Sequence, residues 1–187
     1  GRATRVHRGV SRGHDGQLTR IGTYATGGLG GAAAPGTESD RLASQGSLAF
    51  VPRHHQLIAV NAGSNTVSAF RLRGDMLELE NVVPSGGQFP VSLGVRGGLV
   101  YVLNSGGAGS VSGFLLGPDG LTPIPGSGRS LGLANATPPN FLTSPGQVGF
   151  TPDGKQLLVT TKASTSSIDV FRVAKDGLLS ATPVVNP

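Results

Sequence analysis

The stretch Leu99-Val-Tyr-Val-Leu-Asn-Ser-Gly-Gly-Ala-Gly-Ser-Val-Ser-Gly-Phe114 joins two β-rich runs through a loop of small and polar residues. The same plan recurs at residues 57–70 and 157–171, and each copy closes on Phe. A segment rich in Pro, Asn and Gly, residues 132–144, lengthens the last interval. A repeat of roughly 40–50 residues built from short strands is typical of β-propeller blades. The sequence therefore predicts an all-β propeller fold.

The closing residues of the three copies, Phe70, Phe114 and Phe171, occupy one equivalent position in each repeat. Neighbouring repeats of such proteins pack against one another through equivalent residues. We therefore expect these Phe side chains to pack between blades and not to stack on a ligand.

The composition agrees with a strand-and-turn protein. The chain has 187 residues, with 31 Gly, 13 Pro and only 13% charged residues. Gly and Pro favour tight turns and interrupt helices. Cysteine is absent, so we expect neither disulfides nor thiolate chemistry. No apolar run is long enough for a membrane span. A cleaved leader would leave no trace in the sequence, so a secreted origin stays open. A secreted or periplasmic location is favoured over a cytoplasmic one.

Residues 144–187 form the most regular unit. Tight turns at Pro152-Asp-Gly-Lys155 and Lys175-Asp-Gly177 separate its β-rich runs. This arrangement predicts one blade of four antiparallel strands in meander order. The four strands are expected at residues 146–151, 156–161, 167–173 and 178–184.

The rest of the chain divides in the same way. We expect whole blades at residues 44–87 and 88–131, and the third and fourth strands of an incomplete blade at residues 1–26. The chain is then a single partial propeller domain of about three and a half blades, whereas rings close with roughly four to eight. Two identical copies would not form seven whole blades, because each copy would contribute the same half of a blade. The missing blades are therefore expected from the rest of a longer chain or from a partner.

Several short motifs carry a family resemblance. Ser85-Gly-Gly87 before Pro90-Val-Ser-Leu93, Ala59-Val-Asn-Ala-Gly-Ser-Asn65, and Phe150-Thr-Pro-Asp-Gly154 resemble the lactonase family of seven-bladed propellers. That family includes 6-phosphogluconolactonase-like proteins and carboxymuconate lactonising enzymes. The resemblance implies a seven-bladed ring of which this chain is about half. It also implies cofactor-free lactone hydrolysis, or lactonising isomerisation, in the central channel.

Candidate site residues lie where the topology gathers loops and blade connections on one face. The binding and catalytic residues of such scaffolds generally lie on the loop-rich face, near the channel. Arg129 and Lys162 are the catalytic candidates, because a cation can stabilise the oxyanion of an opening lactone. The binding candidates are Gln45, Asn61, Gln88, Asn104 and Gln147.

These residue types leave two functions open. Gln and Asn cannot titrate near neutral pH, so the loop face favours a non-catalytic binding or interaction scaffold. The alternative is a lactone hydrolase or lactonising isomerase. A small-molecule lactone or a protein is the expected partner, and no metal or other cofactor is expected.

The other motifs favour structural interpretations. Thr26-Gly-Gly-Leu-Gly-Gly31 lacks the Lys-Ser/Thr ending and the helix of a phosphate-binding loop, so we interpret it as a blade connection. Basic residues and histidines gather within residues 1–14, but no aromatic residue is interleaved to stack on bases. We expect a solvated strand face there, with neither nucleic acid nor membrane as partner.

Overall fold

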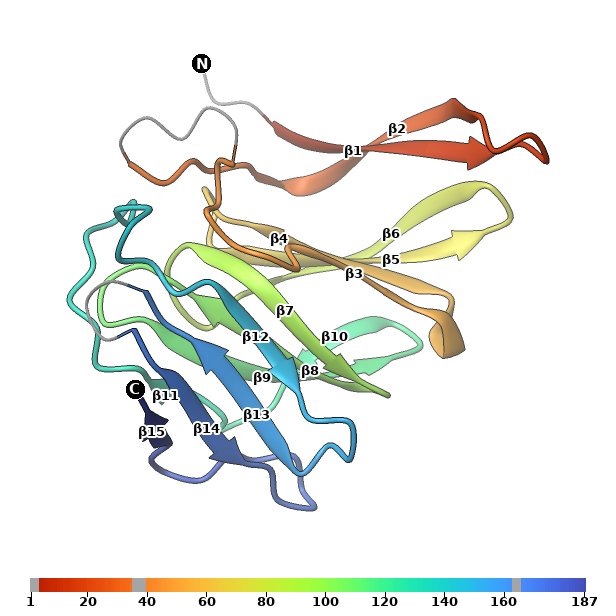
Figure 1. The fold of residues 1–187 in the computed structure, drawn as a ribbon. Helices are drawn as coiled ribbons and strands as arrows, with labels where there is room; N and C mark the ends of the chain where they lie inside the picture. The colour runs from red at the N-terminus through yellow and green to blue at the C-terminus, as the bar shows by residue number, and fades with distance from the viewer. Residues whose placement is uncertain (1–3, 35–39, 163–165) are drawn as a thin grey trace.

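The computed structural model describes residues 4–34, 40–162 and 166–187. Arg2 of the basic N-terminal cluster and part of the 161–166 loop lie outside these ranges. The described chain forms antiparallel sheets that follow one another like the leaves of a fan (Figure 1). The first strand of each whole blade, β3, β7 or β12, borders the inner side of the fan. The predicted all-β propeller blades are confirmed.

The strands group into a half blade and three whole blades. The half blade consists of β1 (Thr4–Arg12) and β2 (Leu18–Leu29). The first whole blade consists of β3 (Leu48–Val51), β4 (Gln56–Asn61), β5 (Thr66–Arg73) and β6 (Met76–Pro84), with a short 3-10 helix at Pro52–His54. The second comprises β7 (Pro90–Arg96), β8 (Leu99–Asn104), β9 (Ser110–Gly117), β10 (Gly120–Pro123) and β11 (Arg129–Ser130). The third comprises β12 (Gln147–Phe150), β13 (Gln156–Thr160), β14 (Ile168–Arg172) and β15 (Val184–Asn186).

The position of β2 in the fan is that of a fourth strand. The hydroxyl of Ser68 donates to the carbonyl of Thr26 at the end of the half blade. The equivalent Ser112 donates to the carbonyl of Gly86, just after β6. Because the two contacts correspond, β2 and β6 occupy equivalent places. The half blade therefore corresponds to the two outer strands of a whole blade.

The Gly-rich connections cross closely over the next blade. Gly27 and Gly86 have positive φ angles of 72° and 79°, which glycine adopts without strain. A Cβ added to Gly87 would lie 2.7 Å from Cγ of Asn104, so only glycine fits there. The expectation that all of Thr26–Gly31 is a blade connection is wrong, because β2 continues to Leu29 and only Gly30 and Gly31 lie beyond the strand.

The fourth strand of the last blade differs from its prediction. A continuous strand over residues 178–184 is wrong, because Leu179 forms only an isolated bridge with Val173 and β15 begins at Val184. Pro183 has no N–H to donate to a ladder. The second blade shows a similar interruption, since residues 124–128 separate β10 from β11 while both pair with β9.

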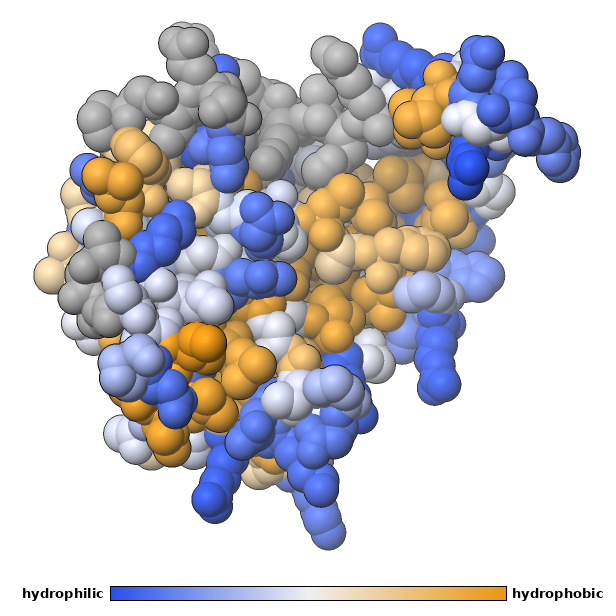
Figure 2. Space-filling model, in the orientation of Figure 1, coloured by the Kyte–Doolittle hydropathy of each residue, from blue (hydrophilic) through white to orange (hydrophobic). Residues whose placement is uncertain are grey.

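The core lies between successive sheets. Phe70, Phe114 and Phe171 are all buried, as the repeat predicted. Apolar side chains also reach the surface: Figure 2 shows hydrophobic residues gathered at the centre of one face, between the β1–β2 sheet and β7. This surface includes part of β3, where Leu48 and Phe50 are exposed.

Tyr101 joins the second and third blades. Its ring meets Phe150 edge to face at 6.2 Å, and its hydroxyl donates to the carbonyl of Gly177 at 2.8 Å. Burial raises the pKa of Tyr101 from about 10 to about 12, and the nearby Arg129 opposes this shift. The polar end of a buried aromatic side chain is thus paired across a blade interface.

This pKa predicts a loss of stability at high pH. In the unfolded chain Tyr101 ionises near pH 10, whereas in the folded protein it keeps its proton to about pH 12. The associated stability is therefore complete below pH 10 and is lost as the pH rises to 12. Urea unfolding between pH 8 and pH 12 measures this loss. The free energy of unfolding of the Tyr101→Phe variant should fall less steeply between pH 10 and pH 12 than that of the wild type. Parallel pH dependences for the two proteins would contradict the raised pKa of Tyr101.

Candidate functional site

The loop-rich face is organised by two blade connections that meet. The backbone N–H of Ala34 donates to the carbonyl of Pro139, and the N–H of Phe141 donates to the carbonyl of Ala34. Ala34 and Asn140 thereby form a parallel bridge. Segments more than 100 residues apart in the sequence are thus linked across this face. All seven sequence-based site candidates lie at or near these connections and the adjacent loops.

Asn61 and Asn104 are fully buried within their blades. Nδ2 of Asn61 donates to the hydroxyls of Thr66 and Ser68 at 3.1 and 2.7 Å. Nδ2 of Asn104 donates to the carbonyl of Ser85 at 3.3 Å. The same position in the last blade is Thr161, whose hydroxyl lies 3.0 Å from that of Ser167. Each whole blade therefore has a buried polar side chain at this position, which makes hydrogen bonds where the strands end. The side chains of Asn61 and Asn104 are not accessible to a ligand at the surface.

Arg129 clamps the second blade to the third. Its guanidinium donates to four backbone carbonyls, those of Gly126, Gly128, Leu179 and Ser180, at 2.6–2.9 Å. Arginine is suited to such multiple contacts because its planar fork offers five donors. The contacts to Leu179 and Ser180 cross between blades, so Arg129 is engaged in holding the fold.

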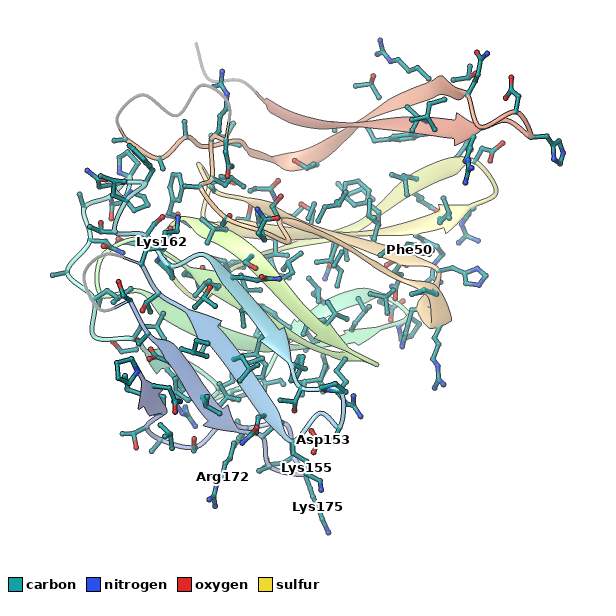
Figure 3. The ribbon with its side chains drawn as sticks, in the orientation of Figure 1. Phe50, Asp153, Lys155, Lys162, Arg172 and Lys175 are labelled. Atoms are coloured by element: carbon teal, nitrogen blue, oxygen red, sulfur yellow. The ribbon has the colours of Figure 1, made fainter. Side chains whose placement is uncertain are left out.

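Lys162 lies at the end of its blade opposite Asp153 and Lys155 (Figure 3). Its Nζ donates to the carbonyls of Ala43 at 2.5 Å and Phe141 at 3.1 Å, one in each of the two joined connections. Partial burial lowers the pKa of Lys162 below its ordinary value, and the Asp40 carboxylate opposes this shift. Lys162 therefore bridges the connections while keeping a perturbed ammonium group on the loop face.

The three glutamines are exposed but do not form one group. Gln45 and Gln147 flank Gly146, whose carbonyl accepts from the N–H of Gln45 at 2.9 Å. Gln88 instead accepts a hydrogen bond from the Thr137 hydroxyl at 2.9 Å. Gln88 and Arg129 both line a shallow hollow of about 440 Å³. The structure thus brings Gln88 near Arg129, and Gln45 and Gln147 near Lys162.

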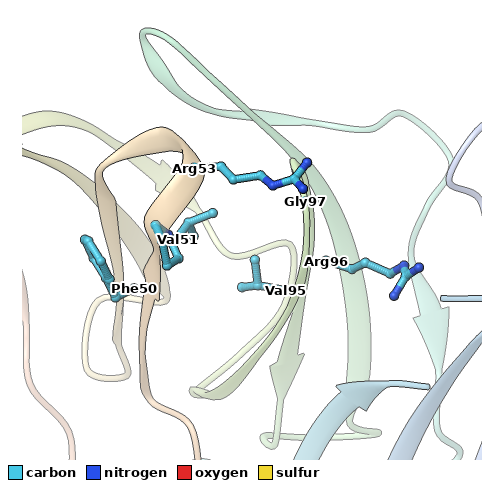
Figure 4. Close-up of a pocket in the computed structure, with 7 residues that line it drawn as sticks. Phe50, Val51, Arg53, Val95, Arg96 and Gly97 are labelled. Atoms are coloured by element: carbon cyan, nitrogen blue, oxygen red, sulfur yellow. The ribbon is translucent and has the colours of Figure 1, made fainter. Parts of the chain in front are cut away.

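A larger pocket of about 730 Å³ opens on the opposite face, between the first turns of the first and second whole blades (Figure 4). Apolar side chains contribute much of its wall, and the Arg53 side chain extends toward Gly97. The Arg96 guanidinium points to the next blade, where it donates to the carbonyl of Pro152. We call this the Arg53 pocket; it is lined by Phe50, Val51, Pro52, Arg53, Val95, Arg96 and Gly97.

Arg53, like Arg96, is an exposed cation that lines this pocket. In the part of the chain that the structure describes, its guanidinium has no hydrogen bond or ion pair. The sequence analysis did not single it out, although a signal was present. Each first turn carries one cation: Arg53, Arg96 or Lys155. The site predicted from the sequence lies on the loop-rich face, whereas Arg53 lies at a first turn on the opposite face.

Neither a metal-binding cluster nor a membrane-spanning helix is found among the described residues. No group of three or more His, Asp or Glu side chains is placed to hold a metal ion among them. None of the helical segments within the described ranges has the length and apolar character of a membrane span.

Comparison with known proteins gives the class of fold. No family model matches the sequence, and no curated protein matches it either. Solved structures do match: the chain has the fold of about half of a 6-phosphogluconolactonase-like propeller.

One similar structure is a "putative 6-phosphogluconolactonase" from Bacteroides uniformis, at 18% identity and a TM-score of 0.68. The match covers 95% of this chain and 50% of that one. Another is a protein from Lactobacillus plantarum, at 16% identity and a TM-score of 0.67, with 96% and 50% covered. A functionally unknown protein from Desulfotomaculum acetoxidans is similar at 18% identity and a TM-score of 0.66. The chain thus spans about half the length of these proteins.

Proposed function

We propose that this protein is a lactonase-like propeller scaffold that binds small organic anions in the Arg53 pocket. The observation that carries the proposal is the exposed Arg53 guanidinium, which has no partner among the described residues, beside a partly apolar hollow of about 730 Å³. Small-molecule sites are generally concave and apolar, with a few polar groups that orient the ligand. A carboxylate or phosphate would accept hydrogen bonds from Arg53, while the carbon chain of the ligand would lie in the hollow beside Val51 and Val95.

The charge of the chain supports an anionic ligand. The formal net charge is +5, and Arg and Lys outnumber Asp and Glu by 15 to 10. Guanidinium groups bind carboxylates and phosphates through paired hydrogen bonds. The Arg96 guanidinium, held by the Pro152 carbonyl, adds positive potential beside the pocket. Phosphorylated sugar acids combine these anionic groups and give a suitable probe, 6-phosphogluconate.

The Arg53→Gln variant tests the proposal. We expect it to weaken binding of 6-phosphogluconate by about tenfold or more, because a charged hydrogen bond contributes about 1.5–3 kcal/mol. Isothermal titration calorimetry measures the affinity. Arg172→Gln is the matched control, since Arg172 is an exposed arginine on the last blade, away from the Arg53 pocket. Equal affinities in the wild type and both variants, or no binding by the wild type, would reject the pocket.

A lactone hydrolase is the second candidate, because the similar Bacteroides uniformis protein is a putative 6-phosphogluconolactonase. In that case Lys162, with its lowered pKa, would stabilise the oxyanion of a lactone in the channel. Hydrolysis of 6-phosphogluconolactone above the spontaneous rate, reduced in Lys162→Met but not in Lys175→Met, would favour this candidate. Binding without turnover would favour the scaffold.

A further inference from the structure

A short segment on the loop-rich face, residues 40–46, lies along the start of β7 before the chain enters β3. We call this segment the strap. The hydroxyl of Ser44 donates to the carbonyl of Val91 in β7 at 2.9 Å. Leu42 is buried and belongs to the same apolar core as Val91. The strap therefore covers the loop-rich end of an inner strand of the fan.

The strap is held from the far side by the last blade and the connection that leads into it. Nζ of Lys162 donates to the carbonyl of Ala43 at 2.5 Å. The N–H of Gln45 donates to the carbonyl of Gly146 at 2.9 Å. Hydrogen bonds from an ammonium group are stronger than those between neutral groups. Lys162 therefore supplies a charged contact that keeps the strap in place.

The backbone is strained on both sides of the contact between the strap and β7. Ala43 in the strap has a φ angle of 51°, and Phe89, just before β7, has a φ angle of 56°. Side chains with a Cβ rarely adopt this left-handed region, because the Cβ crowds the backbone. The Asp40 carboxylate stabilises the turn at Ala43 by accepting its N–H at 3.0 Å. Strained residues of this kind cluster at ligand clamps and switch regions.

We infer that the strap is a lid, which Lys162 holds closed over the loop-rich end of β7. Opening breaks the hydrogen bonds that Ala43 and Ser44 make, releases the strain at Ala43, and uncovers the apolar side chains of Leu42 and Val91. The four-stranded sheets stay paired, since such local openings need less free energy than unfolding of core strands. The lid goes beyond the binding proposed for the Arg53 pocket, which lies on the opposite face.

Amide hydrogen exchange followed by NMR tests the lid in residues 1–187. We expect Lys162→Met to speed exchange of the Gln45 N–H by about tenfold or more, because the closed strap loses a charged hydrogen bond. Exchange of the amides within β8 should stay at the wild-type rate, since the blades remain folded. Ser44→Ala should also speed exchange at Gln45, and it leaves the charge of Lys162 in place.

Lys175→Met is the matched control, because Lys175 is an exposed lysine of the last blade that lies at the end opposite Lys162 (Figure 3). It should leave the exchange rate at Gln45 unchanged. Equal rates at Gln45 in Lys162→Met and Lys175→Met would overturn the inference. So would a Lys162→Met variant in which exchange within β8 speeds up as much as exchange at Gln45. Neither result depends on ligand binding by the Arg53 pocket, so the two proposals can fail separately.

Discussion

Replacing Phe114 by Ala is expected to lower the free energy of unfolding by about 3–5 kcal/mol. Phe114 lies on β9 in the middle blade and is buried between neighbouring sheets. Removing its ring takes away apolar contacts between the blades and leaves a cavity that rigid sheets cannot fill by shifting. Urea unfolding followed by circular dichroism measures the change. The same substitution at Phe70, with a blade on one side and the half blade on the other, should also be strongly destabilising.

Phe50→Ala is the matched control for this prediction. Phe50 is also a strand phenylalanine, but it is 49% exposed. We therefore expect its loss to cost less than about 1 kcal/mol in residues 1–187. Equal destabilisation by Phe114→Ala and Phe50→Ala would contradict the blade-packing role of the repeated phenylalanine.

The repeat made the fold predictable because strand, turn and closing Phe are local signals. The tight turn at Pro152–Lys155 follows from the conformations of Pro, Asp and Gly, and the structure places it between β12 and β13 as expected. The fourth strands were less predictable, because they lie at the outer edge, where one-sided pairing tolerates interruptions. In the last blade residues 180–183 interrupt the pairing, so β15 begins at Val184, whereas the predicted strand covered residues 178–184.

The site was harder to predict because its contacts are long-range. Lys162 is a polar residue in a loop by sequence, yet its ammonium group is held by carbonyls of two connections distant in the chain. Asn61 and Asn104 suggested a polar channel, but they serve buried strand ends. The Arg53 pocket depends on the juxtaposition of two turns from different blades. No local pattern encodes that juxtaposition.

Replacing Arg129 by Ala is expected to lower the free energy of unfolding by about 2–4 kcal/mol. Four backbone carbonyls lose a charged donor, and those of Leu179 and Ser180 are part of the contact between the second and third blades. A charged hydrogen bond contributes about 1.5–3 kcal/mol, and water can replace the donor only at the more exposed carbonyls. Arg172→Ala, at an exposed arginine, should change stability by less than about 0.5 kcal/mol.

Arg129→Lys separates the structural role of Arg129 from a catalytic one. Lysine keeps the positive charge but cannot reproduce the planar fork that reaches four carbonyls. If Arg129 acts as a clamp, Arg129→Lys should lose most of the stability that Arg129→Ala loses, as measured by urea unfolding. If Arg129 instead stabilises an oxyanion, Arg129→Lys should retain stability and much of any lactone hydrolysis, while Arg129→Ala loses the hydrolysis. Both variants remove the planar fork, whereas only Arg129→Lys keeps an ammonium group and its aliphatic stem, so their difference reports what a cation without the fork contributes.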